Sequence, residues 1–291
     1  MRLNLLKPKN FFSSILNNSH IIYVSHCNKV EQVCNDKIYK SEYFPCYHHT
    51  MKEQVVRAND YDIHLYQSGT GRPVVLLLGW MMHAEKFIFR KVLDLALKQH
   101  RSINLVIPHL PGVYKSGPLR STLTIDDYTQ TMDQLFKNIF KGEPVSLIGH
   151  SAGGRFALAY TLRYPTSVKD LVLMSSAGIS QKPATKKRLS KAIYAFSAES
   201  IADNEHLQYY KETFRNIYDL ALEDQLNKVM CKTLIIWGEK DKVIPLRKGE
   251  RMHGLLPNSE LKVFKGVGHM LTLQKQCWES AFEFIEEQYD R

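Results

Sequence analysis

Short apolar runs alternate with segments of helical periodicity along most of this chain. Runs rich in Val, Leu and Ile predict buried strands at residues 74–78, 103–107, 145–148, 171–174, 233–237 and 261–264. Apolar residues at helical spacing predict helices near residues 87–96, 125–140 and 156–164, and from about residue 274 onward. Upstream, apolar residues on either side of Asn59-Asp60 predict an antiparallel hairpin. The alternation predicts an α/β fold with a mostly parallel sheet and helices on both faces.

Residues 1–50 do not follow this alternation. Their apolar clusters are short and are broken by Ser, Asn and His, and no acidic residue precedes Glu31. A mitochondrial type of targeting segment fits the scarcity of acidic residues, but basic residues are sparse as well. We therefore favour a poorly ordered extension, or a start set too early with Met51 as the true first residue, and a cytoplasmic location.

Residues 179–229 also interrupt the alternation. Their spacing predicts two amphipathic helices, the first carrying Leu189, Ile193 and Phe196 and the second carrying Tyr210, Phe214, Ile217, Tyr218 and Ala221. We interpret these residues as a small helical cap inserted over a pocket, which divides the core into residues 51–178 and 230–291. The alternative is a pair of ordinary packing helices whose aromatic residues belong to the core.

The composition is that of one large globular domain, with 291 residues, 44% hydrophobic and 23% charged. The net charge is +10, and residues 1–50 carry +3 of it (six Lys and Arg against three Asp and Glu). One basic run at residues 182–191 is typical of the solvated face of a helix, so we do not expect nucleic-acid binding. The five cysteines include no C-x-x-C pair, which indicates reduced thiols rather than disulfides or a zinc site. No apolar run approaches the roughly 18 residues of a membrane span.

The strongest chemical signal is Gly149-His150-Ser151-Ala152-Gly153-Gly154, which lies between a predicted strand and a predicted helix. A Gly-x-Ser-x-Gly turn in this context is typical of a nucleophile elbow, which exposes the serine Oγ above the sheet. The small neighbours avoid collisions in a sharp turn. The helix N-terminus directs N–H groups toward the position where negative charge develops.

Two further polar groups follow strands at the same predicted sheet edge. Asp241 follows the strand at 233–237, and His269 follows the strand at 261–264. A serine hydroxyl needs a base to remove its proton, and the imidazole of that base needs a carboxylate to orient it. Glu239 is an alternative acid. His150 adjoins the nucleophile, and we interpret it as a structural neighbour rather than the base.

These features resemble the α/β-hydrolase superfamily, in particular its small cap-bearing serine esterase-like members. The resemblance covers about residues 52–289, and three motifs carry it: the elbow, Trp237-Gly238-Glu239-Lys240-Asp241 and Gly266-Val267-Gly268-His269-Met270. It implies that Ser151 is the nucleophile, His269 the base and Asp241 the orienting acid. It implies neither a metal ion nor an organic cofactor.

The resemblance also implies an oxyanion hole built from two backbone N–H groups. One belongs to Ala152, and the other comes from the loop after Leu78, where Trp80 matches the family position and Met81 is the alternative. The family commonly has His-Gly where this chain has Leu78-Gly79. His109 stands where an acidic residue is frequent, which changes the expected pocket wall.

The expected function is hydrolysis of a carboxylic ester or thioester of small to medium, apolar character, through an acyl-enzyme. A C–C bond hydrolase or an acyltransferase would use the same three side chains. A ligand receptor without catalysis is the alternative from another class. The expected partner is a small-molecule substrate.

Overall fold

The computed structural model divides the chain into two compact units, residues 1–49 and 50–291. In the first unit the backbone of three short strands forms an antiparallel sheet, with β1 (Ile22–His26), β2 (Lys29–Cys34) and β3 (Lys37–Lys40). In the second unit the structure describes residues 51–79, 93–94, 97–100, 102–180, 204–218 and 220–289. That residues 1–50 are an extension to the core, or precede the true start, stays a prediction.

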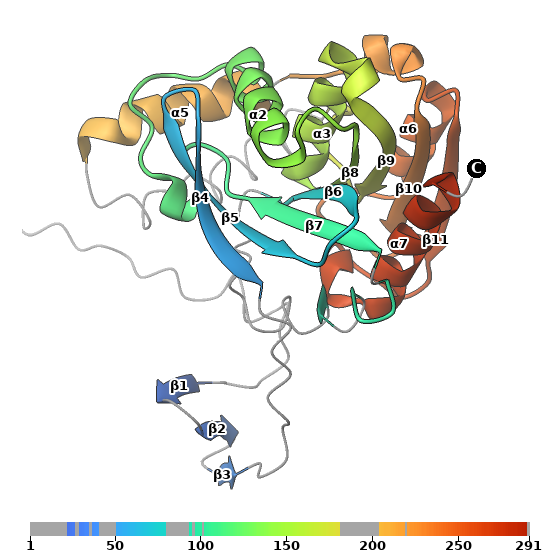
Figure 1. The fold of residues 1–291 in the computed structure, drawn as a ribbon. Helices are drawn as coiled ribbons and strands as arrows, with labels where there is room; N and C mark the ends of the chain where they lie inside the picture. The colour runs from blue at the N-terminus through green and yellow to red at the C-terminus, as the bar shows by residue number, and fades with distance from the viewer. Residues whose placement is uncertain are drawn as a thin grey trace, which may run out of the picture. The chain divides into compact units, whose positions relative to one another are not determined.

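The larger unit is built on an eight-stranded sheet in the order β11-β10-β9-β8-β6-β7-β5-β4 (Figure 1). Its strands are β4 (Lys52–Ala58), β5 (Tyr61–Ser68), β6 (Arg72–Leu77), β7 (Ile103–Pro108), β8 (Val145–His150), β9 (Val168–Met174), β10 (Lys232–Gly238) and β11 (Ser259–Phe264). β4 and β5 form the predicted hairpin, and β5 runs antiparallel to β7. The other neighbours are parallel, which confirms the predicted mostly parallel sheet.

Helices cover both faces of this sheet, as the sequence predicts. The described α-helices are α2 (Ile125–Phe140), α3 (Ala152–Arg163), α5 (Asn204–Tyr218), α6 (Arg247–Leu255) and α7 (Lys275–Tyr289). Consecutive strand residues belong to different cores, because side chains alternate across a strand. Leu147 packs in the core that contains residues of α2, α3 and α6, whereas Ile148 packs in the core that contains Trp278 and Phe282 of α7.

Helix α2 shows how local sequence sets the element boundaries. The Thr124 hydroxyl accepts a hydrogen bond from the Asp127 N–H at 3.3 Å, and the Asp127 carboxylate accepts one from the Thr124 N–H at 2.7 Å. This reciprocal capping box satisfies two N–H groups that the helix leaves open. Lys141, in the left-handed conformation with φ of 57°, ends the helix. The structure confirms the predicted helix over 125–140.

The predicted extent of the second amphipathic helix is wrong. The second amphipathic helix was expected to carry Ala221, but α5 ends at Tyr218 and Ala221 is exposed. The chain leaves the helix there because the Leu222 N–H donates to the carbonyl of Gly178, at 3.0 Å. Of the predicted helix at 87–96 the structure describes residues 93 and 94, which are helical. The predicted helix at 189–196 and the basic run at 182–191 lie outside the described residues.

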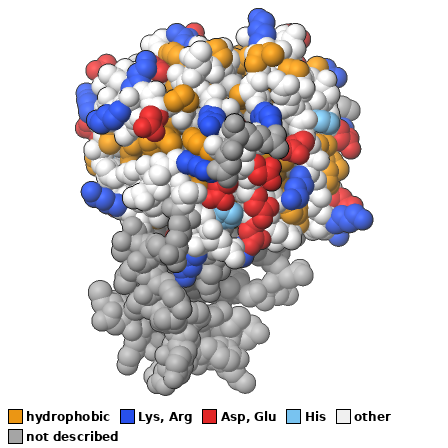
Figure 2. All heavy atoms as spheres, turned by 45° about the vertical axis from the view of Figure 1, so that its right-hand side comes forward, with side chains coloured by type: hydrophobic (Ala, Val, Ile, Leu, Met, Phe, Trp, Pro, Cys, Tyr) orange, Lys and Arg blue, Asp and Glu red, His pale blue; other side chains and the backbone are white. Residues whose placement is uncertain are grey.

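Charged and apolar side chains are mixed on the face of the molecule in Figure 2. On the face in Figure 2, Lys and Arg side chains are scattered among acidic and apolar ones. Among the residues that the structure describes, no helix combines the length and the apolar character needed to cross a lipid bilayer.

Candidate active site

Ser151 lies at the sharp turn between β8 and α3. Its backbone has φ of 55° and ψ of −120°, a conformation that non-glycine residues rarely adopt. Two hydrogen bonds hold the turn: the Ser151 N–H donates to the Met174 carbonyl at 3.0 Å, and the Ser151 carbonyl accepts from the Ala177 N–H at 2.8 Å. The end of the neighbouring strand β9 therefore fixes a turn that local conformational preference disfavours.

The glycines around Ser151 are required by close contacts. A Cβ on Gly153 would lie 2.0 Å from the Leu77 carbonyl oxygen, and one on Gly154 would lie 1.9 Å from Ser176 Oγ. A Cβ on Gly149 would lie 2.5 Å from the Gly154 Cα. These separations are shorter than van der Waals contacts, so the elbow packs in this form only with glycine at the three positions.

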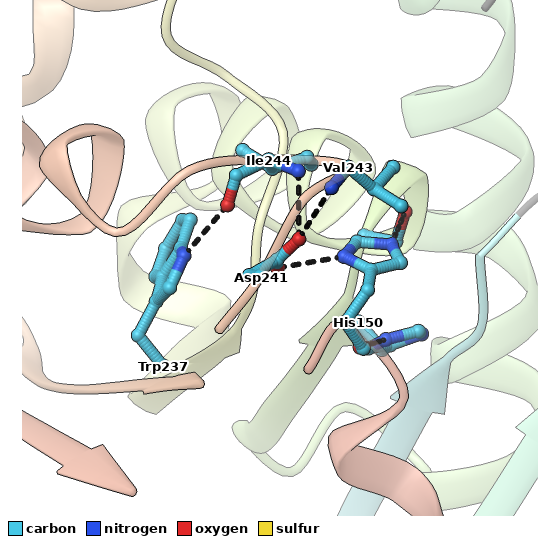
Figure 3. Close-up of polar contacts among 7 residues, drawn as sticks. His150, Trp237, Asp241, Val243 and Ile244 are labelled. Atoms are coloured by element: carbon cyan, nitrogen blue, oxygen red, sulfur yellow. Dashed lines mark hydrogen bonds and ion pairs between the residues drawn. The ribbon is translucent and has the colours of Figure 1, made fainter. Parts of the chain in front are cut away.

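Asp241 lies in the loop after β10, and its side chain is fully buried. One carboxylate oxygen, Oδ1, accepts hydrogen bonds from the N–H groups of Val243 and Ile244, each at 2.8 Å (Figure 3). Burial acts to raise the pKa of Asp241, but the hydrogen bond and charge of His269 and the Ile244 N–H outweigh it, so the pKa is lowered. The carboxylate is therefore held in its ionised form.

His269 connects this carboxylate to the serine. Its Nδ1 lies 2.8 Å from Asp241 Oδ2, and its Nε2 lies 3.0 Å from Ser151 Oγ. Because an ionised carboxylate only accepts, Nδ1 carries the proton and donates. Nε2 then holds the lone pair and accepts from the Ser151 hydroxyl. The structure thus brings the three sequence-predicted side chains into one continuous hydrogen-bonded chain.

The two alternative residues occupy other positions. Glu239 is exposed, and its Oε2 accepts from the Gly266 N–H at 2.9 Å. The ring of His150 is buried, and its Nε2 lies 3.0 Å from the backbone carbonyl oxygen of His269. Neither side chain takes the place of Asp241 or His269 in the hydrogen-bonded chain. Both instead contact the backbone of the loop that carries His269.

The loop after β6 passes directly beside the nucleophile. A Cβ on Gly79 would lie 3.0 Å from Ser151 Cβ and 3.5 Å from Ser151 Oγ. Ala152 is the first residue of α3, and N–H groups in a first helical turn have no partner inside the helix. The predicted donor Trp80 and its alternative Met81 lie outside the described residues. The structure therefore describes one side of the predicted oxyanion hole.

A small recess adjoins Gly79, and most of the side chains that line it are apolar. It is lined by Leu77, Leu78, Gly79, Pro108, His109, Leu110, Val113 and Phe156. His109, the residue that departs from the family pattern, is buried and contributes the imidazole of this wall. Among the described residues, no group of three or more His, Cys, Asp or Glu side chains is arranged to bind a metal ion.

A profile of the α/β hydrolase fold family matches residues 72–199 and 189–276. The chain belongs to this family. It is 24% identical over 254 residues to 2-hydroxy-6-oxo-2,4-heptadienoate hydrolase of Pseudomonas putida, covering 76% of this chain and 91% of that protein. It is 23% identical over 274 residues to a monoacylglycerol lipase of Bos taurus, covering 77% and 79%. A meta-cleavage product hydrolase from Pseudomonas fluorescens superposes with a TM-score of 0.64 at 19% identity, covering 81% and 97%.

Sequence reasoning missed the polar contacts of two buried residues, Trp237 and Arg155, in this α/β hydrolase. The buried indole of Trp237 donates to the Ile244 carbonyl at 2.9 Å, which holds the loop whose N–H groups bind Asp241 (Figure 3). Arg155, in the helix that follows Ser151, is buried and donates to the Ile217 carbonyl at 2.8 Å. A charged residue within the apolar face of a predicted helix was the one available signal for Arg155.

Proposed function

We propose that this α/β hydrolase is a serine hydrolase that cleaves a carboxylic ester or thioester of a small to medium, apolar acyl group. The single observation that carries the proposal is the hydrogen-bonded chain from Asp241 through His269 to Ser151, with separations of 2.8 and 3.0 Å. These separations are within the range needed for proton transfer between a nucleophile and its base.

In the first half of the reaction the enzyme becomes acylated. His269 Nε2 removes the proton from Ser151 Oγ while Oγ attacks the substrate carbonyl carbon. The oxygen of the tetrahedral intermediate is negatively charged, and we assign the N–H groups of Ala152 and Trp80 as its donors. The intermediate collapses with cleavage of the bond to the leaving alcohol, which takes the proton from His269. Asp241 stabilises the imidazolium during these steps.

In the second half water replaces the alcohol. His269 Nε2 removes a proton from water while the hydroxide oxygen attacks the acyl carbon. Collapse of the second tetrahedral intermediate breaks the bond to Ser151 Oγ, which recovers its proton from His269. The acid product leaves and the free enzyme is restored, so the cycle is balanced without a redox partner.

The recess beside the nucleophile supports an apolar acyl group. Its described lining is aliphatic and aromatic apart from glycine and His109, and it contains no Lys or Arg. We also propose that residues 179–229 form the cap over this recess. Support comes from α5, because the Tyr210 ring lies 3.2 Å from the Cβ position of Gly112, between two residues that line the recess, Leu110 and Val113.

Cleavage of a C–C bond is the second candidate, and the relatives favour it. Of the proteins to which the chain is similar, one is a 2-hydroxy-6-oxo-2,4-heptadienoate hydrolase by name, one is a meta-cleavage product hydrolase and one is a monoacylglycerol lipase. A C–C hydrolase acting on an oxo-dienoate must accommodate a carboxylate. We rank ester cleavage first because the described lining of the recess is mostly apolar and suits an apolar acyl group.

The serine mechanism is tested with a fluorophosphonate probe. We expect labelling of the wild type and none of Ser151→Ala, with unchanged melting temperature. Asp241→Asn should lower kcat by about 10⁴-fold. Its matched control, Glu239→Gln, removes the neighbouring carboxylate and should stay within threefold of the wild type. Absence of labelling in folded wild-type protein would favour a ligand receptor instead.

The substrate class is tested by comparing kcat/KM across substrates. The panel contains p-nitrophenyl esters graded by acyl length, a monoacylglycerol, and a 2-hydroxy-6-oxo-dienoate whose cleavage bleaches its absorbance. Faster cleavage of the dienoate than of every ester would overturn the ester proposal in favour of the C–C reaction. Partition of the acyl group to added alcohols would instead indicate acyl transfer.

A further inference from the structure

His150 is a buried residue that the proposed reaction does not use. It directly precedes Ser151, it is 1% exposed, and its ring centroid lies 5.2 Å from that of His269. Its Nε2 lies 3.0 Å from the His269 carbonyl oxygen. Its Nδ1 is buried without a hydrogen-bond partner and lies 3.4 Å from the position of a Cβ on Gly79.

These contacts define the state of the His150 ring. A carbonyl oxygen only accepts, so Nε2 carries the proton and donates to it. Burial, and after it the charge of the neighbouring His269, lowers the pKa of His150 to about 3. The ring is therefore neutral with its lone pair on Nδ1. It adds no positive charge beside His269 when that residue becomes protonated during the reaction.

The loop that carries His269 makes more polar contacts with the loop after β10 than with the elbow. Three polar contacts join residues 266–269 to the loop after β10: the Asp241–His269 bond at 2.8 Å, the Lys240 N–H to the Val267 carbonyl at 2.8 Å, and the Gly266 N–H to Glu239 at 2.9 Å. Within the described part of the chain, two polar contacts join the same loop to the elbow. They are the Ser151–His269 bond and the His150–His269 bond.

One of the two hydrogen bonds between this loop and the elbow is lost during the reaction. When Ser151 Oγ carries the acyl group it has no proton to donate, so the Ser151–His269 hydrogen bond no longer exists. The His150–His269 bond does not involve the reacting atoms and persists. The His269 carbonyl also accepts from the Leu271 N–H at 3.0 Å, so the loop keeps its local fold without His150.

We propose that His150 is a positioning residue that holds His269 at the elbow while Ser151 is acylated, and so acts mainly on deacylation. This inference rests on the proposed acyl-enzyme mechanism. In the free enzyme Ser151 and His150 both keep the imidazole in place. In the acyl-enzyme, the hydrogen bond from His150 is the polar contact that remains between the elbow and the loop that carries His269. In this state His269 must activate water. Its loss is therefore expected to slow the second half of the reaction more than the first.

Two amide variants form a matched pair for the test. The side-chain N–H of Gln reaches about as far as the Nε2 of His and keeps the donor, whereas Asn is one methylene shorter and does not reach the carbonyl. His150→Met is a second variant that fills the space without a donor. His100→Asn is the control, because His100 is also buried and hydrogen-bonded, to Glu286 at 2.7 Å, but precedes β7 at the opposite end of the sheet.

The two half-reactions are measured separately. Stopped-flow bursts with p-nitrophenyl butyrate give the acylation and deacylation rates, and butyrate esters of different leaving alcohols show whether kcat depends on the leaving group. We expect His150→Asn and His150→Met to slow deacylation at least tenfold and acylation less than threefold. Their kcat should become independent of the leaving group. His150→Gln and His100→Asn should stay within threefold of the wild type in both steps.

Other results overturn the inference. Equal slowing of the two steps by His150→Asn or His150→Met, or no slowing of either, would show that His150 does not act selectively on deacylation. The same conclusion follows if His150→Gln behaves like His150→Asn. If the wild type shows no burst and no fluorophosphonate labelling, the proposed function itself falls, and the inference falls with it. A purely structural role would lower the melting temperature without separating the two rates.

Discussion

At the scale of single residues, Gly79 lies so close to the nucleophile that even a methyl group there is expected to reduce activity. An alanine methyl there would lie 3.0 Å from Ser151 Cβ and 3.5 Å from Ser151 Oγ. That is tighter than usual side-chain packing, so the loop after β6 or the serine must shift by a few tenths of an ångström. Because small displacements of reacting groups reduce rates strongly, we expect Gly79→Ala to lower kcat/KM at least tenfold. Ester hydrolysis and thermal melting of the purified variant check this.

The matched control is Gly254→Ala in α6. A Cβ at this position would meet nothing within 4 Å, and alanine is the better helix former. We expect unchanged activity and equal or slightly higher stability. If Gly79→Ala were as active as Gly254→Ala, the loop after β6 would not be close enough to the reacting atoms to form an oxyanion hole.

The contrast between Ser151 and His150 shows what a sequence can and cannot predict at this scale. The elbow is a local pattern, because its strand, its glycines and its helix all lie within a few residues of Ser151. His150 instead contacts His269, which lies 119 positions further along the chain, and Ser151 is 118 positions from the same residue. Sequence order alone predicted that the three polar groups share one sheet edge, but not which carbonyl the extra histidine would bind.

At the scale of elements, the boundaries followed local chemistry where a cap was present. Thr124 and Asp127 close the start of α2, and the helix has the predicted bounds. Strand β8 instead continues to His150, two residues past its predicted end, because its ladder with β9 extends to Met174. That pairing depends on a neighbouring strand that local periodicity does not report. The end of α5 depends in the same way on a distant partner, Gly178.

Helix α5 is joined to the core by long-range polar contacts. Buried Arg155 of α3 donates to the Ile217 carbonyl at 2.8 Å, near the C-terminus of α5, where carbonyls lack partners within the helix. The Leu123 N–H also donates to Thr213 Oγ1 at 2.8 Å. The fixed position of α5 beside the recess therefore rests in part on a cation in the helix that follows the nucleophile.

We predict that Arg155→Met loosens α5. The Ile217 carbonyl keeps its longer hydrogen bond from the Leu220 N–H, at 3.3 Å, but loses the buried charged donor, and a hydrogen bond of that kind contributes about 1.5–3 kcal/mol. Hydrogen exchange followed by mass spectrometry should show faster exchange across residues 204–218, with a lower free energy of unfolding in urea. Arg163→Met is the control on the same helix. Its side chain is 36% exposed and pairs with Asp126 at the surface, so its loss is expected to cost under about 1 kcal/mol. Wild-type exchange rates in α5 of Arg155→Met would contradict the prediction.

At the scale of the whole molecule, two buried carboxylates lie at opposite ends of the parallel strands. Asp241 follows β10, where hydrogen bonds and His269 lower its pKa. Asp170 lies near the start of β9 and is 0% exposed. Burial raises the pKa of Asp170 to about 7, although the Ser146 hydroxyl, at 3.0 Å, and the charge of Lys169 act in the other direction. Its second oxygen, Oδ1, is buried without a hydrogen-bond partner. The ionised form is therefore stabilised for Asp241, at the carboxyl ends of the strands, and disfavoured for Asp170, at their amino ends.

Asp170 should therefore make the fold less stable as the pH rises. An unfolded aspartate has a pKa near 4, so between pH 4 and 7 the folded chain binds more protons than the unfolded one. The stabilisation by the protonated form is fully present below about pH 4 and is lost by about pH 7. Each unit of difference in pKa corresponds to about 1.4 kcal/mol, so the loss is a few kcal/mol. Asp170→Asn removes this titration. Relative to the wild type, the variant should gain stability from about pH 4.5 to about pH 7 in urea unfolding, and the difference should level off above that pH.

The control for Asp170→Asn is Asp60→Asn, which makes the same change at a side chain that is 98% exposed. A constant difference between Asp170→Asn and the wild type would mean that Asp170 is ionised in the folded protein across this range. Asp170 is remote from the proposed reacting groups, so its effect on the free energy of unfolding can be measured apart from the rate of ester hydrolysis. Its substitution should change the pH dependence of unfolding and leave the pH dependence of ester hydrolysis unaltered. The carboxyl ends of the strands can then carry the reaction while a carboxyl group at their amino ends limits the pH range in which the fold is most stable.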